Sequence, residues 1–356
     1  MFSELGYKMT RADWNIPNGL IVSLTSFPTR IHFVPKVIES ILSQTVKADK
    51  ILLWLAEEQF PNKEGDLPAQ LIEQLKCGLD ICWCDDLKPH KKYYYAMRNF
   101  PDHIVVTVDD DVIYPNNLIE TLLESYVKYP YAVSAMRAHF ITFGPNGNIL
   151  PYEKWKREYR RVGEPSMALC ATGVGGILYP PNIMNNELFN KDAIKKLCIY
   201  ADDLWLKVMQ VIACTPVVIA APPQKLVYID GSQEEALWRM NDLAGANDTQ
   251  LSNILEYYNA YWGGNDTIMH RMYISSLNMR TSRQQSENAT QLQKDIKAAK
   301  KEIKAIQRSW SFRIGRFVTF IPRKLRGGIR CYQEHGFQYT LSRIKLKVKH
   351  VIGVKI

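Results

Sequence analysis

Three consecutive aspartates, Asp109, Asp110 and Asp111, follow the strongest strand signal of the chain, residues 103–108. Side chains alternate along a strand, so Asp109 and Asp111 are expected to project to one side and Asp110 to the other. Carboxylates crowded at one strand end repel each other unless a cation neutralises them, and oxygen-only ligands suit Mg²⁺ or Mn²⁺. The segment TVDDDVIYP therefore predicts a divalent metal site, with a solvated acidic loop as the alternative.

A second pair of carboxylates, Asp202 and Asp203, lies in the segment YADDLWLKV. A carboxylate within hydrogen-bond reach of a substrate hydroxyl can take its proton. Crowding two carboxylates together raises the pKa of one of them toward a useful value. The alternative is an acidic pair that caps the start of a helix.

The elements that must position these side chains alternate over roughly the first 115 residues. Apolar, β-branched runs predict strands at 19–24, 50–55, 79–83 and 103–108, with helical spacing over 34–45 and from Leu71 to Leu75. The alternation predicts an α/β fold with a mainly parallel sheet and helices on both faces. Ligands of such sheets bind at the carboxyl ends of the strands, which points to Thr25–Arg30, Asp85–Lys92 and Asp109–Asp111.

Further along the chain the patterns are mixed. The expected elements are helices over 117–128 and 191–210, a short strand at AVSA, a glycine cluster over 168–180 and two apolar runs within 217–229. From about residue 283 the composition changes, and apolar residues recur at heptad spacing at Leu292, Ile296, Ala299, Ile303, Ile306 and Trp310. We expect a domain over 1–282, a heptad-patterned helix over 283–309 and a tail over 310–356.

The apolar strand that ends in DDD and continues as VIYP resembles the DxD motif of GT-A glycosyltransferases, in particular family 2-like bacterial enzymes. The segments PHKKYYYAM upstream and YADDLW downstream strengthen the resemblance, which covers about residues 18–270. It implies a nucleotide-binding half over about 18–115 and an acceptor half over about 116–282. It also implies a nucleotide-sugar donor, with UDP as the expected nucleotide.

The resemblance further implies that the DxD carboxylates hold Mn²⁺ or Mg²⁺, which bridges the two phosphates of the donor. Asp111 takes the place of the metal ligand and Asp109 that of the ribose and metal neighbour, with Asp110 between them. The family often adds a histidine late in the domain, and His270 is the candidate in this chain.

The same resemblance assigns donor-binding roles to loop residues. They are Thr25, Ser26 and Arg30 after the first strand, Asp86 and Lys92 after the third (with Lys91 as a competitor), and Gly175 and Gly176 in ATGVGGILYP. The alternatives are a polar loop with a helix cap for the first group and ordinary turn glycines for the last. The three tyrosines after Lys92 favour a core position over stacking on a ligand.

The segment YADDLWLKV resembles the family's xED element, whose second acidic residue is the catalytic base of inverting enzymes. This assigns the base to Asp203, with Asp202 beside it. The implied acceptor is a glycan or a lipid-linked glycan in bacterial surface polysaccharide synthesis. Three alternatives remain: a retaining transferase on the same fold, a metal-dependent phosphoryl-transfer enzyme, and a non-catalytic scaffold that mediates membrane binding or assembly.

Charge is unevenly spread along the chain. The net charge is +9, but residues 291–356 hold 17 Lys and Arg against 3 Asp and Glu, so the preceding residues are net acidic. Within 310–356, aromatic residues interleave with arginines, which favours an anionic membrane surface as partner over nucleic acid. A third interpretation is that this basic tail packs on the chain's own acidic body. Separately, the heptad pattern allows a homodimer through residues 286–310.

The compartment is expected from composition. The longest nearly uninterrupted apolar stretch, Val211–Pro223, is shorter than the ~20 residues that a spanning helix needs. The first residues contain no apolar core of a secretory signal, and seven cysteines without framework spacing favour a reducing compartment. We therefore expect a cytoplasmic protein, peripheral at the inner face of the membrane.

Overall fold

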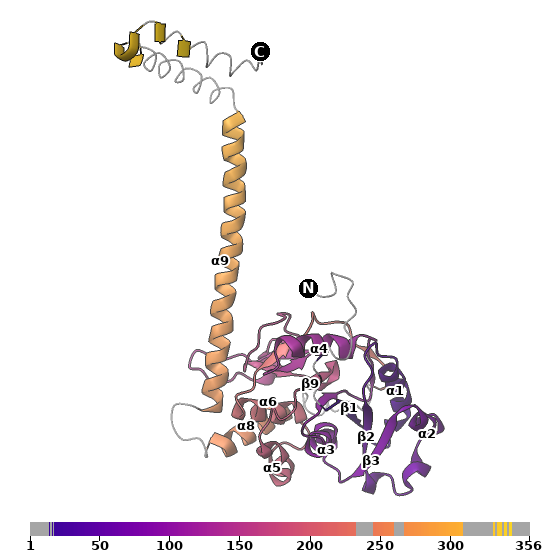
Figure 1. Ribbon diagram of the computed structural model, residues 1–356. Helices are drawn as coiled ribbons and strands as arrows, with labels where there is room; N and C mark the ends of the chain where they lie inside the picture. The colour runs from indigo at the N-terminus through magenta and orange to yellow at the C-terminus, as the bar shows by residue number, and fades with distance from the viewer. Residues whose placement is uncertain are drawn as a thin grey trace. The chain divides into compact units, whose positions relative to one another are not determined.

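The structure is a computed structural model (Figure 1). It describes Trp14, Ile16, residues 18–232, 245–259 and 267–308, and in the C-terminal part 330–331, 333–336, 338–339 and 342–343. The chain divides into two compact units, Met1–Thr281 and Ser282–Ile356. No helix within these described ranges is both long and apolar enough to cross a bilayer.

Seven strands of the first unit form one sheet in the order β10-β6-β9-β4-β1-β2-β3. They are β1 (Leu20–Thr25), β2 (Lys50–Ala56), β3 (Leu79–Cys84), β4 (Ile104–Thr107), β6 (Val133–Ala135), β9 (Ile177–Tyr179) and β10 (Val217–Ile219). Neighbouring strands are parallel except that β9 runs antiparallel to both β4 and β6. The predicted α/β class with a mainly parallel sheet is confirmed.

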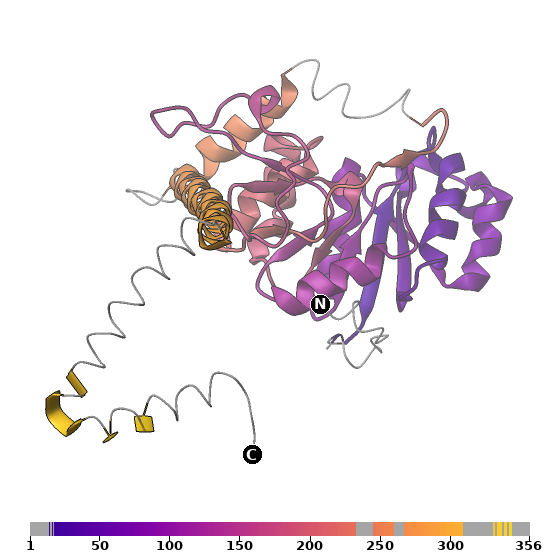
Figure 2. The ribbon, with the colours of Figure 1, turned by 90° about the horizontal axis from the view of Figure 1, so that it is seen from above.

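Helices cover both faces of this sheet (Figures 1 and 2). On one face the alternate β1 residues Leu20, Val22 and Leu24 pack against helices α1 (Val34–Leu42), α2 (Ala69–Gln74) and α4 (Leu118–Lys128). On the other face Ile21 packs with Trp54 of β2 and with helix α3 (Lys91–Asn99). Two-sided burial explains why these strands are continuous apolar runs in the sequence.

The helical pattern over 191–210 proves to be two helices, α5 (Lys191–Leu197) and α6 (Asp202–Ile212), so the single predicted helix is wrong. At the break, the Cys198 carbonyl accepts a hydrogen bond from Nε2 of the buried His90 at 2.7 Å. The break matters because it places Asp202 and Asp203 at the start of α6.

Two further helices complete the described chain, α8 (Ala246–Asn259) and α9 (Ile268–Arg308). Helix α9 begins well before the position expected from the heptad pattern. Two of the heptad residues, Leu292 and Ile296, are 61% and 46% exposed. Trp310 and most of the basic tail, on which the membrane prediction depends, lie outside the described residues. Both the membrane partner and the homodimer therefore stay predictions.

Candidate active site at the carboxyl edge of the sheet

The acidic cluster lies where β4 ends, at the carboxyl edge of the parallel strands. A two-residue strand, β5 (Val112–Ile113), follows the aspartates and pairs with β11 (Val227–Tyr228). Because β9 is antiparallel to β4, the glycine turn that precedes β9 comes to the same edge. The start of α6 joins them, so segments far apart in the sequence meet at one place, as expected for an open α/β sheet.

Arg30 neutralises two of the three aspartates. Its Nη2 lies 2.9 Å from Oδ1 of Asp110 and 2.6 Å from Oδ2 of Asp111, and all three side chains are 8% exposed. The Ser26 hydroxyl donates to Oδ2 of Asp110 at 2.6 Å. Burial nevertheless raises the pKa of Asp110 to about 6, with Arg30 opposing the shift. The structure thus brings the predicted residues Ser26 and Arg30 to the aspartates themselves.

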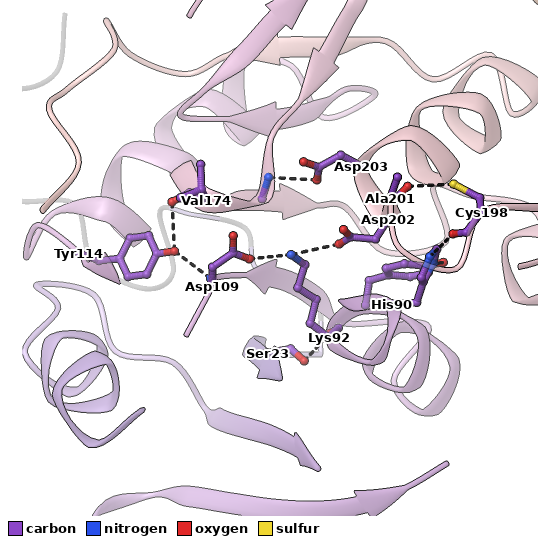
Figure 3. Close-up of polar contacts among 12 residues, drawn as sticks. Ser23, His90, Lys92, Asp109, Tyr114, Val174, Cys198, Ala201, Asp202 and Asp203 are labelled. Atoms are coloured by element: carbon purple, nitrogen blue, oxygen red, sulfur yellow. Dashed lines mark hydrogen bonds and ion pairs between the residues drawn. The ribbon is translucent and has the colours of Figure 1, made fainter. Parts of the chain in front are cut away.

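Lys92 connects Asp109, the aspartate that Arg30 does not contact, to helix α6 (Figure 3). Its Nζ lies 2.6 Å from Oδ1 of Asp109 and 3.0 Å from Oδ2 of Asp202. The Ser23 hydroxyl of β1 fixes the Lys92 backbone by donating to its carbonyl at 2.5 Å. A lysine in the first turn of a helix opposes the helix dipole, so these ion pairs must hold it there. The same contacts raise the pKa of Lys92 well above its ordinary value against a strong opposing effect of burial.

Gly173 provides the space in which these groups meet. A Cβ atom at this position would lie 2.6 Å from Nζ of Lys92, 3.2 Å from Oδ1 of Asp109 and 3.4 Å from Oδ1 of Asp203. The first of these distances is a clash. A larger residue here would force Nζ of Lys92 to shift, so the glycine lets three charged side chains approach closely. The sequence had not indicated this role for Gly173.

Asp203 is the carboxylate best suited to accept a proton. Its Oδ1 accepts a hydrogen bond from the Gly173 N–H at 3.0 Å. Burial, and next the negative charge of Asp202, raise the pKa of Asp203 to about 8, whereas Lys92 and the Gly173 N–H oppose the shift. A carboxylate with a pKa near neutrality is poised for proton transfer near physiological pH. This supports the predicted distinction between the two members of the acidic pair.

Two tyrosines neighbour the site, and from the sequence Tyr114 had no assigned role and Tyr93 only a core position. The Tyr114 hydroxyl accepts from the Asp109 N–H at 2.8 Å and donates to the Val174 carbonyl at 3.2 Å, which ties β4 to the glycine turn. The Tyr93 hydroxyl lies 2.8 Å from Nδ1 of His90, and burial lowers the pKa of His90 to about 4. The first tyrosine of YYY is therefore buried, as expected, but it orients a neutral histidine that anchors the turn before α6.

The remaining predicted donor residues have other partners in the structure. The Thr25 hydroxyl donates to the Trp54 carbonyl at 2.8 Å. Asp86 is nearly enclosed: it accepts from Gln59 and pairs with Lys88 and Lys91, and the basic neighbours help to lower its pKa to about 2 against burial.

The two predicted glycines serve packing. A Cβ on Gly175 would lie 2.7 Å from the Cβ of Arg137, and Gly176 has a φ of +90° and packs on Leu118. Both positions thus require glycine for reasons that involve neighbouring protein atoms. Their predicted contact with the donor stays a prediction.

A divalent metal fits the chemistry of this site. Five aspartates lie at this edge, Arg30 and Lys92 pair with four of them, and their ligand atoms are all oxygen, which Mg²⁺ and Mn²⁺ prefer. Of the three DDD side chains, that of Asp109 is the most open, at 27% exposed against 8% for the other two. Mg²⁺ is commonly bound by one or two carboxylates together with substrate phosphate oxygens.

No ready-made metal cage accompanies that chemistry. In the part of the chain that the structure describes, no group of three or more His, Cys, Asp or Glu side chains is close enough to hold a metal ion. The predicted ligand His270 lies exposed on α9 and joins no such group. Asp111, the other predicted ligand, is engaged by Arg30. A metal would therefore be held chiefly through Asp109, with Asp111 available only if its pair with Arg30 opens.

Comparison with known proteins gives likeness of fold only. No protein-family model matches the sequence, and no curated protein matches it. Among solved structures, a mannosyltransferase from Pyrobaculum calidifontis in complex with GDP-Man and Mn²⁺ is 12% identical, with a TM-score of 0.43 over 95% of this chain and 88% of that chain. A CMP:2-keto-3-deoxy-manno-octonic acid synthetase complexed with CTP is 12% identical, with a TM-score of 0.37 over 63% of this chain and 98% of that chain.

A third solved structure, a 4-diphosphocytidyl-2C-methyl-D-erythritol synthase, is 7% identical, with a TM-score of 0.37 over 62% of this chain and 98% of its own. At such low identities and TM-scores, these likenesses say nothing of the substrate or reaction of this chain. Its function has to be inferred from its own site residues.

Proposed function

We propose that this chain is a metal-dependent, inverting glycosyltransferase that moves a sugar from a nucleotide-sugar, with UDP as the expected nucleotide, to a glycan or lipid-linked glycan in bacterial surface polysaccharide synthesis. One observation supports the proposal most: Oδ1 of Asp109 and Oδ1 of Asp203 both lie within 3.4 Å of the place of a Cβ on Gly173. The acidic strand end that resembles a donor site thus adjoins the carboxylate that resembles a base.

Asp203 has the properties of the base in this reaction. Its raised pKa lets it take a proton from an acceptor hydroxyl near neutral pH, and the Gly173 N–H orients one of its oxygens. The deprotonated hydroxyl oxygen attacks the anomeric carbon, and the bond from that carbon to the diphosphate oxygen breaks. The proton stays on Asp203 until solvent removes it, so atoms and charge balance within a single displacement.

The other charged residues hold this arrangement in place. Lys92 pairs with Asp109 and Asp202 beside Asp203, and the negative charge of Asp202, after burial, raises the pKa of the base. Arg30 holds Asp110 and Asp111 at the strand end. A divalent metal bound at Asp109 would act as a Lewis acid that takes up charge on the departing diphosphate.

Ligand-induced thermal stabilisation tests the donor half of the proposal. The intact chain is heated with UDP, GDP, CMP or dTDP, each in the presence of Mn²⁺ or of EDTA. Ligands that bind the native state raise the Tm by mass action. We expect one nucleoside diphosphate to raise the Tm with Mn²⁺ and less with EDTA. No shift with any nucleotide would contradict a nucleotide-sugar transferase.

Product analysis tests the reaction itself. Transfer should release a nucleoside diphosphate, and the glycoside formed should have the anomeric configuration opposite to that of the donor. Retained configuration would indicate a retaining transferase, and release of inorganic phosphate without a glycoside would indicate a phosphoryl-transfer enzyme. Activity that depends on Asp109 but survives deletion of residues 283–356 would exclude a scaffold whose function lies in the C-terminal segments.

A further inference from the structure

The cations that the sequence assigned to phosphate binding are already engaged by the protein. Arg30 faces Asp110 and Asp111, and Lys92 faces Asp109 and Asp202. Each cation is therefore outnumbered by carboxylates at its own position. A diphosphate that approached this edge would meet a surplus of negative charge, so besides a metal at Asp109 a basic side chain that the aspartates do not occupy would favour its binding.

Arg137 lies at the same edge and is such a cation. It follows the end of β6 by two residues, and β6 and β4 end at the same edge because β9 is antiparallel to both. The backbone carbonyl of Arg137 accepts from the Thr172 N–H at 3.0 Å, and its Cβ would clash with a Cβ on Gly175. The glycine turn therefore seats Arg137 directly beside the candidate active site.

The Tyr228 hydroxyl is influenced electrostatically by both Arg137 and the acidic cluster. Its pKa is raised chiefly by burial, and the charges that act on it belong to Arg137, Asp111, Asp109 and Glu158. One hydroxyl thus lies within electrostatic reach of both the arginine and the strand-end aspartates. The geometry agrees with this: the glycine turn that contacts the Arg137 backbone through Thr172 and Gly175 also contains Gly173, where an added Cβ would lie 3.2 Å from Oδ1 of Asp109.

Arg137 is only lightly held in the described structure. Its Nη2 pairs with Oε1 of Glu158 at 3.1 Å, and the Glu158 side chain is 53% exposed against 21% for Arg137. Exposed pairs of this kind contribute little, typically under about 1 kcal/mol. The Nε atom of Arg137 is buried and has no hydrogen-bond acceptor among the described residues. A guanidinium has five N–H donors in a fixed fork that suits phosphate oxygens. Arg137 therefore has N–H donors left for a further acceptor.

We propose that Arg137 binds the diphosphate of the donor nucleotide, and that Glu158 is its counter-ion in the ligand-free protein, displaced when the phosphate arrives. The proposal rests on the proposed function and deepens it by assigning the phosphate contact to a residue that the motif resemblance does not include. No bond is made or broken in this step. One exposed carboxylate leaves the guanidinium for solvent, and a phosphate oxygen takes its place.

Isothermal titration calorimetry tests the proposal. It measures the binding of inorganic pyrophosphate and of UDP to the full chain, with and without Mn²⁺. Pyrophosphate reports on phosphate recognition independently of the nucleotide base. Arg137→Gln should weaken pyrophosphate binding at least tenfold, because charge-assisted hydrogen bonds are lost. Glu158→Gln should tighten it by severalfold, because the competing carboxylate is removed. The double variant should behave like Arg137→Gln alone.

Arg161→Gln is the matched control. Arg161 and Glu164 form a pair of comparable exposure on the same segment, with Nη1 to Oε1 at 3.0 Å, and this variant should leave pyrophosphate affinity unchanged. Glu158 is exposed, so Glu158→Gln keeps the test valid even if Arg137→Gln fails to fold. Affinities within twofold of wild type for both site variants, with UDP still bound, would overturn the role of Arg137 but leave the transferase proposal intact. Arg137-dependent pyrophosphate binding without any nucleotide binding would support the anion site and contradict the transferase.

Discussion

Nζ of Lys92 lies 2.6 Å from Oδ1 of Asp109. The same ammonium group reaches Asp202 at 3.0 Å, so it joins the acidic end of β4 to the first turn of α6. The Lys92 side chain is only 6% exposed, which means that this cation is part of the protein's own charge balance. Its loss would leave buried carboxylates facing one another without compensation.

Replacing Lys92 by methionine should therefore destabilise the fold. Removal of one partner from a buried ion pair typically costs about 3 to 5 kcal/mol, since the remaining charges stay desolvated. Urea unfolding followed by tryptophan fluorescence measures this difference. The control is Lys50→Met: Lys50 pairs with Asp80 at 3.6 Å, both side chains are about half exposed, and the expected cost is under about 1 kcal/mol. Equal costs for both variants would contradict a structural role of Lys92.

Asp203→Asn should abolish turnover and leave donor binding intact. The amide can still accept the Gly173 N–H, so the local structure should persist, but it cannot take a proton from an acceptor. Single-turnover transfer assays together with nucleotide titration separate the two effects. Retention of more than a tenth of wild-type activity would show that another group is the base.

The pH dependence of activity should follow the ionisation of Asp203. A base must be deprotonated to act, and burial and Asp202 raise the pKa of Asp203 to about 8 in the ligand-free protein. The value of kcat/KM, which reports on free enzyme, should therefore rise with pH up to about 8 and then level off. A profile that is flat between pH 6 and 9 would argue against this carboxylate as the base.

Stability should change with pH in the opposite direction. Between the ordinary aspartate pKa and about 8, the folded protein holds a proton on Asp203 that the unfolded chain releases. The free energy of unfolding from this group therefore falls as pH rises through that interval. Asp203→Asn removes the effect, so its stability relative to wild type should increase between pH 5 and 8. Urea titrations at several pH values measure the difference, and parallel pH curves would contradict the raised pKa.

Gly173→Ala should disturb the site without unfolding the protein. The added methyl group would lie 2.6 Å from the flexible end of Lys92, so the ammonium group must move away from the two aspartates. We expect turnover to fall by at least an order of magnitude and the Tm to fall as well, though by less than for Lys92→Met, because the ammonium group is displaced but not removed. Gly78→Ala is a control for substitution as such, because no atom lies within 4 Å of the added carbon, although Gly78, unlike Gly173, has a positive φ of +100°. That control should lower the Tm and keep activity.

Much of this protein follows from its sequence alone. Alternation of apolar runs with helical spacing determined the α/β class, because a strand buried on both faces must be apolar throughout. The DDD and ADD segments could be singled out because neighbouring carboxylates repel each other unless a cation neutralises them, and because both segments resemble motifs of a known family. The break between α5 and α6 was missed; at this break His90, a residue far away in the chain, donates a hydrogen bond to the Cys198 carbonyl, a contact that local sequence patterns do not show.

Only the tertiary structure decided which charges meet. Sequence spacing cannot show that Lys92 joins Asp109 to Asp202, that Arg30 occupies Asp110 and Asp111, or that Arg137 is left with a single exposed partner. Each of these contacts depends on strand order, since an antiparallel β9 between β4 and β6 brings the glycine turn to the acidic edge. The energy of an ion pair falls off over a few ångströms. The positions of these charged side chains, which the whole sheet fixes, therefore determine the chemistry of the site.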